Sequence, residues 1–309
     1  MKIVYFGTPY FAARVLSYLI SESFSISAVI TRPDRPKGRS LKVSPSPVKK
    51  MVQESFPEML LLQPEKASNP EFLEKLRSLQ ADLFVVVGYG QILSEELLRI
   101  PKLCINVHAS LLPKYRGADP MRRALLAGEK ESGITIMKMV KELDAGDMYE
   151  KEKITIDSDI NFTELQEKLI QVSGPLLKKV LKQYQSQTLS PEKQDERLSN
   201  YAKKIASQER EISWNFPAEQ IHNQIRAFSK TPGAWCFIQV KGEKKKCKIL
   251  RSKVAQQNGA PSEVLEQTKK KLVVACKEKA LEILELQLEG KKPLTIQSFL
   301  AGFQEKILF

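Results

Sequence analysis

Residues 2–30 read KIVYFGTPYFAARVLSYLISESFSISAVI and predict a strand, a helix and a second strand in succession. Lys2–Phe6 is a run of β-branched and aromatic residues, and Gly7-Thr8-Pro9 closes it. Phe11–Ile20 then spaces its apolar residues near the helical period of about 3.6, and Ile26–Ile30 is again typical of a strand. Strands and helices in alternation favour a mostly parallel sheet.

The same alternation continues through the rest of the first half of the chain. Leu83–Val87 is an unbroken apolar run, as in strands that are buried on both faces of a parallel sheet. Leu103–His108 predicts another strand. We expect helices at Glu71–Leu79, Pro120–Leu126 and Phe162–Tyr184, and paired strands at Gly133–Met139 and Tyr149–Ile156. The pattern predicts an α/β fold, with helices on both faces of the sheet.

The second half of the chain has a different pattern. Residues 186–200, SQTLSPEKQDERLSN, are polar without periodicity and indicate a linker. Beyond them, a helix at Ala218–Phe228 precedes short strand-like runs that favour a small β-barrel or sandwich. These runs are Trp235–Val240, Cys247–Leu250, Lys271–Cys276 and Ala280–Leu288. We therefore expect a first domain at 1–185, a linker at 186–203 and a second domain at 204–309.

Charge is spread unevenly over the 309 residues. The net charge is +13, and residues 201–309 hold 20 basic and 11 acidic side chains, a balance of +9, with no Asp. Such a positive field favours a polyanionic partner, most simply a nucleic acid. The lysine runs at 244–246 and 269–271 predict solvated turns.

Composition excludes several classes of protein. A hydrophobic fraction of 42% is typical of a globular chain. No apolar run approaches the roughly 20 residues of a membrane helix, and no signal peptide is visible, so we expect a cytoplasmic protein that binds no membrane. Four cysteines without a CxxC pair and only two histidines argue against a metal site. The absence of a G-x-G-x-x-G pattern and of a P-loop argues against nicotinamide and ATP.

Asn106 and His108 are the first candidates for chemistry. They flank one apolar residue on a predicted strand, so their side chains point to the same face close to the strand's end. Ligands of open α/β sheets bind at this carboxyl edge. An amide beside an imidazole can stabilise an oxyanion and move a proton, although a buried, hydrogen-bonded core pair fits the spacing equally well. Cys104 precedes them on the strand and is expected in the core.

Two further segments follow predicted strands. Leu143–Met148 reads LDAGDM, and one carboxylate of this segment could reach the same edge, although Asp and Gly are also ordinary turn residues. Residues 31–50 hold seven basic side chains against one Asp, with four prolines and one glycine. This segment predicts either a mobile basic loop that grips a phosphate backbone or a solvated surface loop.

Together these motifs resemble the methionyl-tRNA formyltransferases, a branch of the folate-dependent formyltransferase family. The shared motifs of the first half are Phe6–Pro9, Pro33–Pro36, Gly38-Arg39, Ser44–Lys49, Asn106–His108, Ser110–Pro113, Arg116-Gly117, Thr135–Met137 and Leu143–Met148. Those of the second half are Tyr201–Ile205 and Ile225–Phe228. Asn-x-His, Ser-Leu-Leu-Pro and Leu-Asp-x-Gly-Asp specify the reaction type, whereas the basic segment and the second-half motifs resemble the tRNA enzymes in particular.

The resemblance implies a Rossmann-like first domain that takes a formyl group from 10-formyltetrahydrofolate, and an OB-like second domain that binds tRNA. The acceptor would be the α-amino group of initiator methionyl-tRNA, and the product N-formylmethionyl-tRNA would serve translation initiation. By the same resemblance, the catalytic residues are Asn106, His108 and Asp144. The folate contacts would be Ser110, Leu111, Leu112 and Pro113. The tRNA contacts would be Arg35, Lys37, Arg39 and Lys42. We expect a monomer.

The sequence departs from the family pattern at a few positions, namely Ala109, Asp119, Ala145, Ser213 and Ser229–Thr231. Two alternatives compete with the tRNA enzyme. A sister formyltransferase that acts on a small amine would use the same three residues, but it would need neither the basic segment nor a second domain with a balance of +9. A basic RNA-binding protein with a decayed enzyme domain would not need to keep the three catalytic residues.

Overall fold

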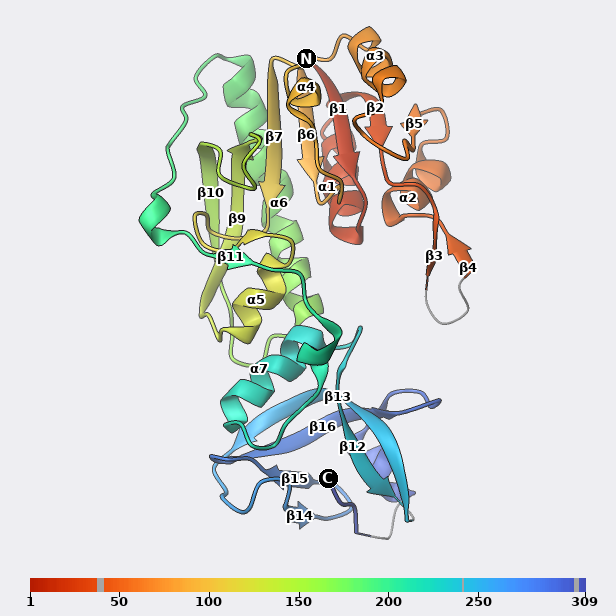
Figure 1. The fold of residues 1–309 in the computed structure, drawn as a ribbon, viewed down its shortest axis with the longest axis vertical. Coiled ribbons are helices and arrows are strands. Elements are labelled where there is room, and N and C mark those ends of the chain that lie inside the picture. The colour runs from red at the N-terminus through yellow and green to blue at the C-terminus, as the bar shows by residue number, and fades with distance from the viewer. Residues whose placement is uncertain (38–41, 241, 303–305) are drawn as a thin grey trace. The chain divides into compact units, whose positions relative to one another are not determined.

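The computed structural model describes residues 1–37, 42–240, 242–302 and 306–309 (Figure 1). It divides the chain into two compact units, each built from separate stretches of sequence. The first unit comprises Met1–Gly117, Gly133–Ile154 and Glu167–Tyr201. The second unit comprises Ala118–Ser132, Thr155–Gln166 and Ala202–Phe309. Within the described residues, no helix is both long and apolar enough to cross a membrane.

A seven-stranded sheet organises the first unit. Its strands are β1 (Lys2–Gly7), β2 (Ser25–Ile30), β5 (Leu61–Leu62), β6 (Leu83–Val87), β7 (Leu103–His108), β9 (Glu131–Lys138) and β10 (Met148–Thr155). They lie in the order β10-β9-β7-β6-β1-β2-β5. The strands from β7 to β5 are parallel, and β9 runs antiparallel to β7. The expected mostly parallel sheet is therefore confirmed.

Helices cover both faces of this sheet, as the sequence pattern predicts. They are α1 (Tyr10–Ser21), α2 (Pro47–Ser55), α3 (Pro70–Ser78), α4 (Glu95–Leu98) and α6 (Phe162–Gln185). Val4 and Phe6 of β1 pack in one apolar cluster with Leu73 of α3. Tyr5 points the opposite way, and its hydroxyl donates to the carbonyl of Ala12 in α1 at 2.7 Å. Figure 1 shows α1 and α6 together behind the sheet.

Where the structure describes it, the basic segment at 31–50 contains regular elements, whereas its proline and glycine content predicts a loop. Arg35–Lys37 (β3) and Lys42–Ser44 (β4) pair as an antiparallel hairpin, and α2 already begins at Pro47. The hydroxyl of Ser46 caps this helix by accepting a backbone N–H of the first turn at 3.0 Å. Proline has no N–H to leave unbonded at the first helical position, so the residue type that favours a loop here begins a helix.

The second unit is built on an antiparallel sheet. Its strands are β12 (Ala234–Val240), β13 (Glu243–Ala255), β14 (Val264–Gln267), β15 (Leu272–Ala275), β16 (Ala280–Leu288) and β17 (Leu294–Thr295). They lie in the order β12-β13-β16-β15-β14, and β17 pairs with β16. The helices of this unit are α5 (Pro120–Leu126), α7 (Ala218–Phe228) and α8 (Ile296–Ala301). Ile221, Ile225 and Phe228 of α7 join the core of the curled sheet, which confirms the expected small β domain.

The lysine run at 244–246 lies inside a strand, whereas the sequence predicts a turn. In β13, Lys244 and Lys246 pair with Gln239 and Phe237 of β12. The Lys246 ammonium lies 3.5 Å from the centre of the Trp235 ring, and the Lys244 ammonium lies 4.5 Å from that of Phe237. Contacts between a cation and an aromatic face are favourable, so the neighbouring strand offsets the repulsion within the run. The remaining short elements are β8 (Arg116–Gly117), β11 (Tyr201–Ala202) and two 3-10 helices at Glu196–Leu198 and Ser207–Arg210.

Candidate active site

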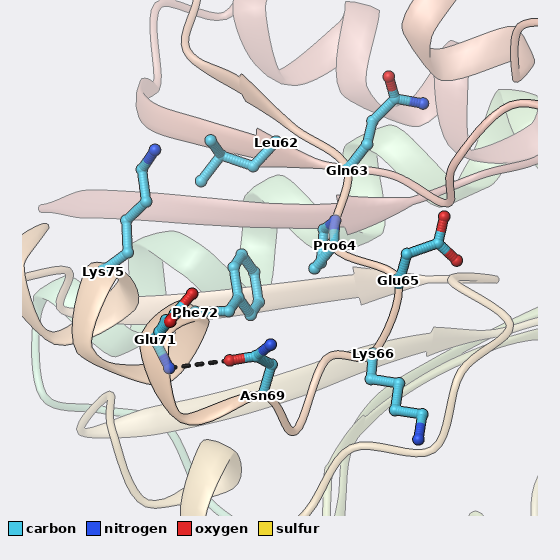
Figure 2. A pocket seen from close by; sticks show the side chains of 9 residues that line it. All are labelled: Leu62, Gln63, Pro64, Glu65, Lys66, Asn69, Glu71, Phe72 and Lys75. Atoms are coloured by element: carbon cyan, nitrogen blue, oxygen red, sulfur yellow. Dashed lines mark hydrogen bonds between the residues drawn. The ribbon is translucent and has the colours of Figure 1, made fainter.

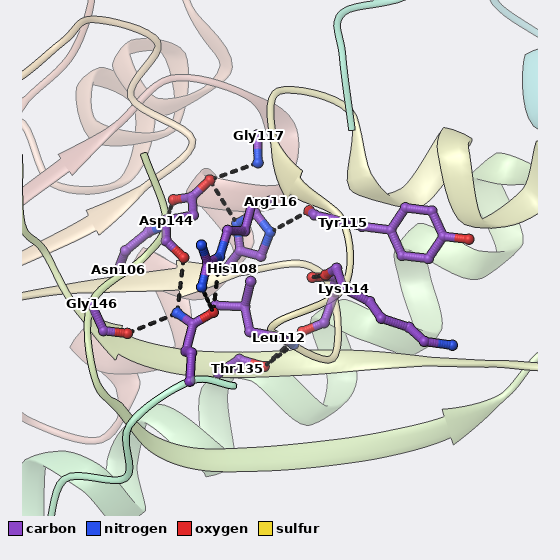
Figure 3. A network of polar contacts seen from close by, with 12 residues as sticks. Asn106, His108, Leu112, Lys114, Tyr115, Arg116, Gly117, Thr135, Asp144 and Gly146 are labelled. Carbon is purple, nitrogen blue, oxygen red and sulfur yellow. Dashed lines mark hydrogen bonds and ion pairs between the residues drawn. The ribbon is translucent and has the colours of Figure 1, made fainter. Parts of the chain in front are cut away.

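Three side chains predicted from the sequence meet at the carboxyl end of β7. Asn106 and His108 are alternate residues of this strand, and Asp144 comes from the loop between β9 and β10 (Figure 3). The Asn106 side-chain amide donates to Asp144 Oδ1 at 3.3 Å. His108 Nδ1 lies 3.6 Å from Asp144 Oδ2, which is an ion-pair distance rather than a hydrogen bond. The carboxylate thus lies between the amide and the imidazole; we call these three residues the Asn-His-Asp cluster.

The cluster is almost closed to solvent. The side chains of His108 and Asp144 are 5% and 9% exposed, and Asn106 is 9% exposed. Electrostatic interactions are stronger at such a site than in bulk water. The strand order reverses between β1 and β6, because the chain passes from β1 to β2 on one side and then returns to β6 on the other side. The cluster lies on β7, the strand next to β6, and is therefore close to this reversal. Ligands of open α/β sheets bind at the carboxyl ends of strands near such a reversal.

Close packing, and not turn propensity alone, determines the conformation of the Asp144 loop. The φ of Asp144 is +51°, in the left-handed region that costs an L-residue roughly 1–2 kcal/mol. The backbone N–H of Gly117 donates to Asp144 Oδ2 at 2.8 Å. Gly146 lies two residues after Asp144 in the same loop. A Cβ at this position would lie 2.0 Å from the backbone oxygen of Lys138, so only glycine fits there. The loop is therefore held against β9 with its carboxylate pointing to β7.

The His108 ring lies between two acceptors. Its Nε2 is 2.9 Å from the backbone carbonyl of Tyr115, and because a carbonyl only accepts, Nε2 carries the hydrogen. Its Nδ1 faces the Asp144 carboxylate. The imidazolium is the only form of the ring that donates to both neighbours at once. The ring is thus held in one orientation between the carbonyl of Tyr115 and the carboxylate of Asp144.

The side-chain hydroxyl of Thr135 holds the backbone of Ser110–Pro113, the four predicted folate contacts that follow β7. Thr135 of β9 donates its hydroxyl to the carbonyl of Ser110 at 2.7 Å and accepts the N–H of Leu112 at 3.1 Å. Ser110 and Leu112 are both 2% exposed, whereas the other two residues are partly exposed. This segment follows His108 closely in the sequence. Its backbone is held by β9, the same strand that precedes the Asp144 loop.

The predicted tRNA contacts that the structure describes lie in a different part of the first unit. Arg35, Lys37 and Lys42 belong to the β3–β4 hairpin, which follows β2, and β1 and β6 separate β2 from β7 in the sheet (Figure 1). The exposed Arg35 guanidinium forms an ion pair with Glu65. Lys37 and Lys42 pair with each other in the hairpin backbone. Arg39 lies outside the described residues.

A buried arginine beside the cluster was missed by the sequence reasoning. The Arg116 side chain is 1% exposed, and its guanidinium donates to Gln194 and Glu196. Both partners belong to the polar segment that the sequence predicts as a linker. Buried arginines are rare unless paired, but the only signal in the sequence was that Arg116 lies in a motif shared with the family.

A cavity of about 300 Å³ lies beside α3 and is a less suitable site (Figure 2). Its lining runs between Leu62 and Lys75, and no predicted site residue of the described chain contributes to it. Asn69 at its edge accepts the backbone N–H of Glu71 at 2.9 Å, which is an ordinary helix cap. Its charged side chains do not converge as those of the cluster do, so we assign no chemistry to this cavity.

The cysteines lie in the interior. Cys104 is 3% exposed, and burial raises the pKa of its thiol far above the usual range, so the expectation of a core residue is confirmed. In the part of the chain that the structure describes, no three His, Cys, Asp or Glu side chains gather in a way that would hold a metal ion.

Comparison with known proteins identifies the family. Residues 1–181 match the family model described as formyl transferase, and residues 204–304 match the model described as formyl transferase, C-terminal domain. The methionyl-tRNA formyltransferase of Protochlamydia amoebophila is 44% identical, over 100% of this chain and 97% of that protein. The enzyme of the same name from Citrifermentans bemidjiense is 43% identical, over 98% of this chain and 94% of that protein.

Solved structures share the fold at low identity. HypX from Aquifex aeolicus in complex with tetrahydrofolic acid superposes with a TM-score of 0.66 at 14% identity, over 100% of this chain and 50% of that chain. An N-formyltransferase from Helicobacter canadensis, in complex with folinic acid and dTDP-3-aminofucose, gives a TM-score of 0.63 at 19% identity, over 92% and 98% of the two chains. From the family models and the full-length relatives together, it follows that this chain belongs to the formyl transferase family.

Proposed function

We propose that this enzyme transfers the formyl group of 10-formyltetrahydrofolate to the α-amino group of initiator methionyl-tRNA. The product would be N-formylmethionyl-tRNA, which begins translation. The observation that carries the proposal is full-length similarity to methionyl-tRNA formyltransferases in a chain whose Asn106, His108 and Asp144 side chains meet. The tetrahydrofolic acid in one structural relative supports the folate donor, and the balance of +9 in residues 201–309 supports a nucleic-acid acceptor.

The proposed reaction needs no covalent enzyme intermediate. The free amine of methionyl-tRNA attacks the formyl carbon, and a tetrahedral oxyanion forms. The bond from that carbon to N10 of the folate then breaks, and the proton lost by the amine ends on N10. The protein has two tasks in this reaction: to stabilise the oxyanion with hydrogen-bond donors and to carry the proton from the amine to N10.

We assign these tasks to the Asn-His-Asp cluster. The single contact to Asp144 leaves Asn106 a second amide N–H for the oxyanion. The Nε2–H of His108 now donates to the carbonyl of Tyr115, and in the proposed step the oxyanion takes the place of this carbonyl. Asp144 faces the other ring nitrogen, so it orients and charge-stabilises His108, and in the proposed step its carboxylate helps to carry the proton from the attacking amine to N10.

We propose that Ser110, Leu111, Leu112 and Pro113 bind the folate. Support comes from their place directly after His108 and from their fixed backbone. We propose that Arg35, Lys37, Arg39 and Lys42 bind the tRNA, because the segment 31–50 that holds them has seven basic residues against one Asp, which suits a phosphate backbone. The family models at 1–181 and 204–304 support a catalytic domain at 1–185, a linker at 186–203 and a tRNA-binding domain at 204–309. We further propose that the enzyme acts as a monomer in the cytoplasm.

The experiment that tests the function is transfer of a radiolabelled formyl group from 10-formyltetrahydrofolate to purified acceptors. We expect labelled methionine on initiator methionyl-tRNA and no label when the folate is omitted. A nucleotide-linked amino sugar is the control for the sister activity, and uncharged initiator tRNA is the control for the amine. Label on the amino sugar but not on methionyl-tRNA would replace the proposed function with the sister reaction.

A further inference from the structure

We infer that Gln194 is a positioning residue for Asp144. The inference rests on the proposed function, in which Asp144 serves the formyl transfer. Gln194 lies in the polar segment 186–203, to which the sequence assigns no chemistry. Two backbone hydrogen bonds between Glu192 and Met148, of 2.7 and 2.8 Å, fasten this segment to the start of β10. The segment therefore runs alongside the Asp144 loop and does not hang free.

Every hydrogen-bonding group of the Gln194 side chain has a partner. Its Nε2 donates to the backbone carbonyl of Asp144 at 2.9 Å and to that of Gly146 at 2.8 Å. Its Oε1 accepts from Arg116 Nε at 3.0 Å and from Arg116 Nη2 at 2.8 Å. One amide thus joins the Asp144 loop to a buried guanidinium.

The chemistry of the partners fixes which way the amide faces. A guanidinium only donates and a carbonyl only accepts, so turning the Gln194 amide around would oppose like groups at all four contacts. Arg116 is itself held, because its Nη1 and Nη2 donate to the Glu196 carboxylate at 2.9 and 2.7 Å. With its side chain 1% exposed, the guanidinium cannot exchange these partners for water without opening the fold.

The adjacent residues Arg116 and Gly117 hold the backbone and the carboxylate of Asp144. Arg116 acts on the carbonyl of Asp144 through Gln194, and the N–H of the next residue, Gly117, donates to the carboxylate at 2.8 Å. Both contacts converge on a residue whose φ of +51° lies in the left-handed region, which residues other than glycine adopt uncommonly and Asp more often than most. Removing the Gln194 contacts frees the backbone of Asp144 to relax, and the carboxylate then moves relative to His108 and Asn106.

Two substitutions separate shape from hydrogen bonding. Gln194→Glu keeps the size and the acceptor for Arg116, but it has no N–H for the two carbonyls. Gln194→Met keeps the approximate volume and loses all four contacts. The matched control is Lys193→Gln at the exposed neighbouring position. We expect kcat for formyl transfer to fall about 10- to 100-fold in both Gln194 variants, with KM for both substrates within about twofold of wild type.

A double-mutant cycle distinguishes positioning of Asp144 from general damage to the fold. Rates are expressed per mole of folded enzyme, measured by circular dichroism. We expect Gln194→Met to change kcat by less than about twofold in an Asp144→Asn background, because the group that Gln194 positions is already disabled. A full additional loss in that background would overturn the inference, as would wild-type kcat in both single variants. If Gln194→Met does not fold, Gln194→Glu carries the same cycle.

A measurement without substrate keeps this inference separate from the proposed function. Hydrogen exchange at the Gly117 amide reports directly on its bond to the Asp144 carboxylate. We expect exchange at least about tenfold faster in both Gln194 variants than in wild type or Lys193→Gln. Unchanged exchange would refute the inference even if the enzyme formylates methionyl-tRNA. Faster exchange in a protein without that activity would refute the function alone.

Discussion

The Asn-His-Asp cluster and the β3–β4 hairpin hold their polar groups in opposite ways. In the cluster, the side chains are 5–9% exposed. Strand β7 holds two of them, and the third belongs to a loop that packs closely at Gly146 and accepts a hydrogen bond from the backbone N–H of Gly117. On the hairpin, the ion pair of Arg35 with Glu65 joins side chains that are 55% and 69% exposed. Exposed ion pairs contribute only about 0–1 kcal/mol. Arg35 can therefore exchange its carboxylate for a phosphate at little cost, whereas the cluster cannot rearrange without breaking buried contacts.

The difference predicts how each region fails when it is changed. Loss of a group from the cluster should lower the rate of the chemical step and leave binding intact. Loss of a charge from the hairpin should weaken tRNA binding and leave the chemical step intact. The predictions below test this division.

The largest effect is expected for His108→Ala. The variant loses the ring that faces both Asp144 and the carbonyl of Tyr115. We expect kcat to fall roughly 10²–10⁴-fold, the range for a lost acid–base group. Filter binding of methionyl-tRNA should match wild type, because the basic surface is unchanged. A variant that loses binding in proportion to its rate would break the division.

A methyl group at Gly146 should give the next largest effect. Its Cβ would lie 2.0 Å from the backbone oxygen of Lys138, so the Asp144 loop must shift. We expect kcat to fall on the order of 10²-fold in Gly146→Ala, because displacements near 1 Å can have that cost. Gly302→Ala is the matched control, since the nearest atom to its Cβ is 3.8 Å away. Equal rates in the two variants would show that the loop tolerates movement.

A smaller effect is expected on the hairpin, and its partner provides the control. Arg35→Ala removes a charge, whereas Glu65→Ala breaks the same ion pair and leaves that charge in place. We expect KM for methionyl-tRNA to rise a few-fold in Arg35→Ala alone, with kcat unchanged. The slope of log K against log salt should fall by roughly 0.7–0.9, as for one lost phosphate contact. Similar increases in KM in both variants would mean that tRNA binding depends on the ion pair between Arg35 and Glu65 and not on the positive charge of Arg35.

The smallest effect concerns acid stability and is separate from both regions. His222 in the second unit is buried between the hydroxyl of Ser252 and the carbonyl of Ser158. Burial lowers its pKa from the usual value of 6.5. Below that value the unfolded chain binds a proton that the folded chain resists, so this group lowers the stability of the fold as the pH falls. The slope is at most about 1.4 kcal/mol per pH unit.

Melting temperatures at pH 7.5 and 5.5 check this. We expect the loss on acidification to be smaller in His222→Gln than in wild type. An equal loss in the two proteins would assign the acid sensitivity to other groups.

Elements that one pattern specifies could be predicted from the sequence. β6 has the predicted bounds, because its unbroken apolar run indicates a strand buried on both faces, and β7 has the predicted bounds as well. The α7 helix has them too, since its apolar residues keep the helical period. The shared direction of Asn106 and His108 followed from strand alternation. The proximity of the Asp144 carboxylate to these two side chains could not be predicted from a pattern, because it depends on how β9 and β10 position the loop between them.

Contacts made by polar segments could not be predicted. Proline and glycine at 31–50 are compatible with a loop and with a hairpin, and the cap at Ser46 was obscured by the surrounding charge. The polar segment around Gln194 has no periodicity, so its bonds to Asp144 arise only when the fold is complete. Lys244 and Lys246 needed the aromatic residues of a neighbouring strand to be compatible with β13.

The most direct test of the division is the single-turnover rate of formyl transfer for His108→Ala and Arg35→Ala, with methionyl-tRNA and 10-formyltetrahydrofolate both saturating. Saturation removes differences in binding, so the rate reports on the chemical step alone. We predict that His108→Ala is slower than wild type by roughly 10²–10⁴-fold and that Arg35→Ala matches wild type. A near-normal rate for His108→Ala, or an equal loss in Arg35→Ala, would contradict the account.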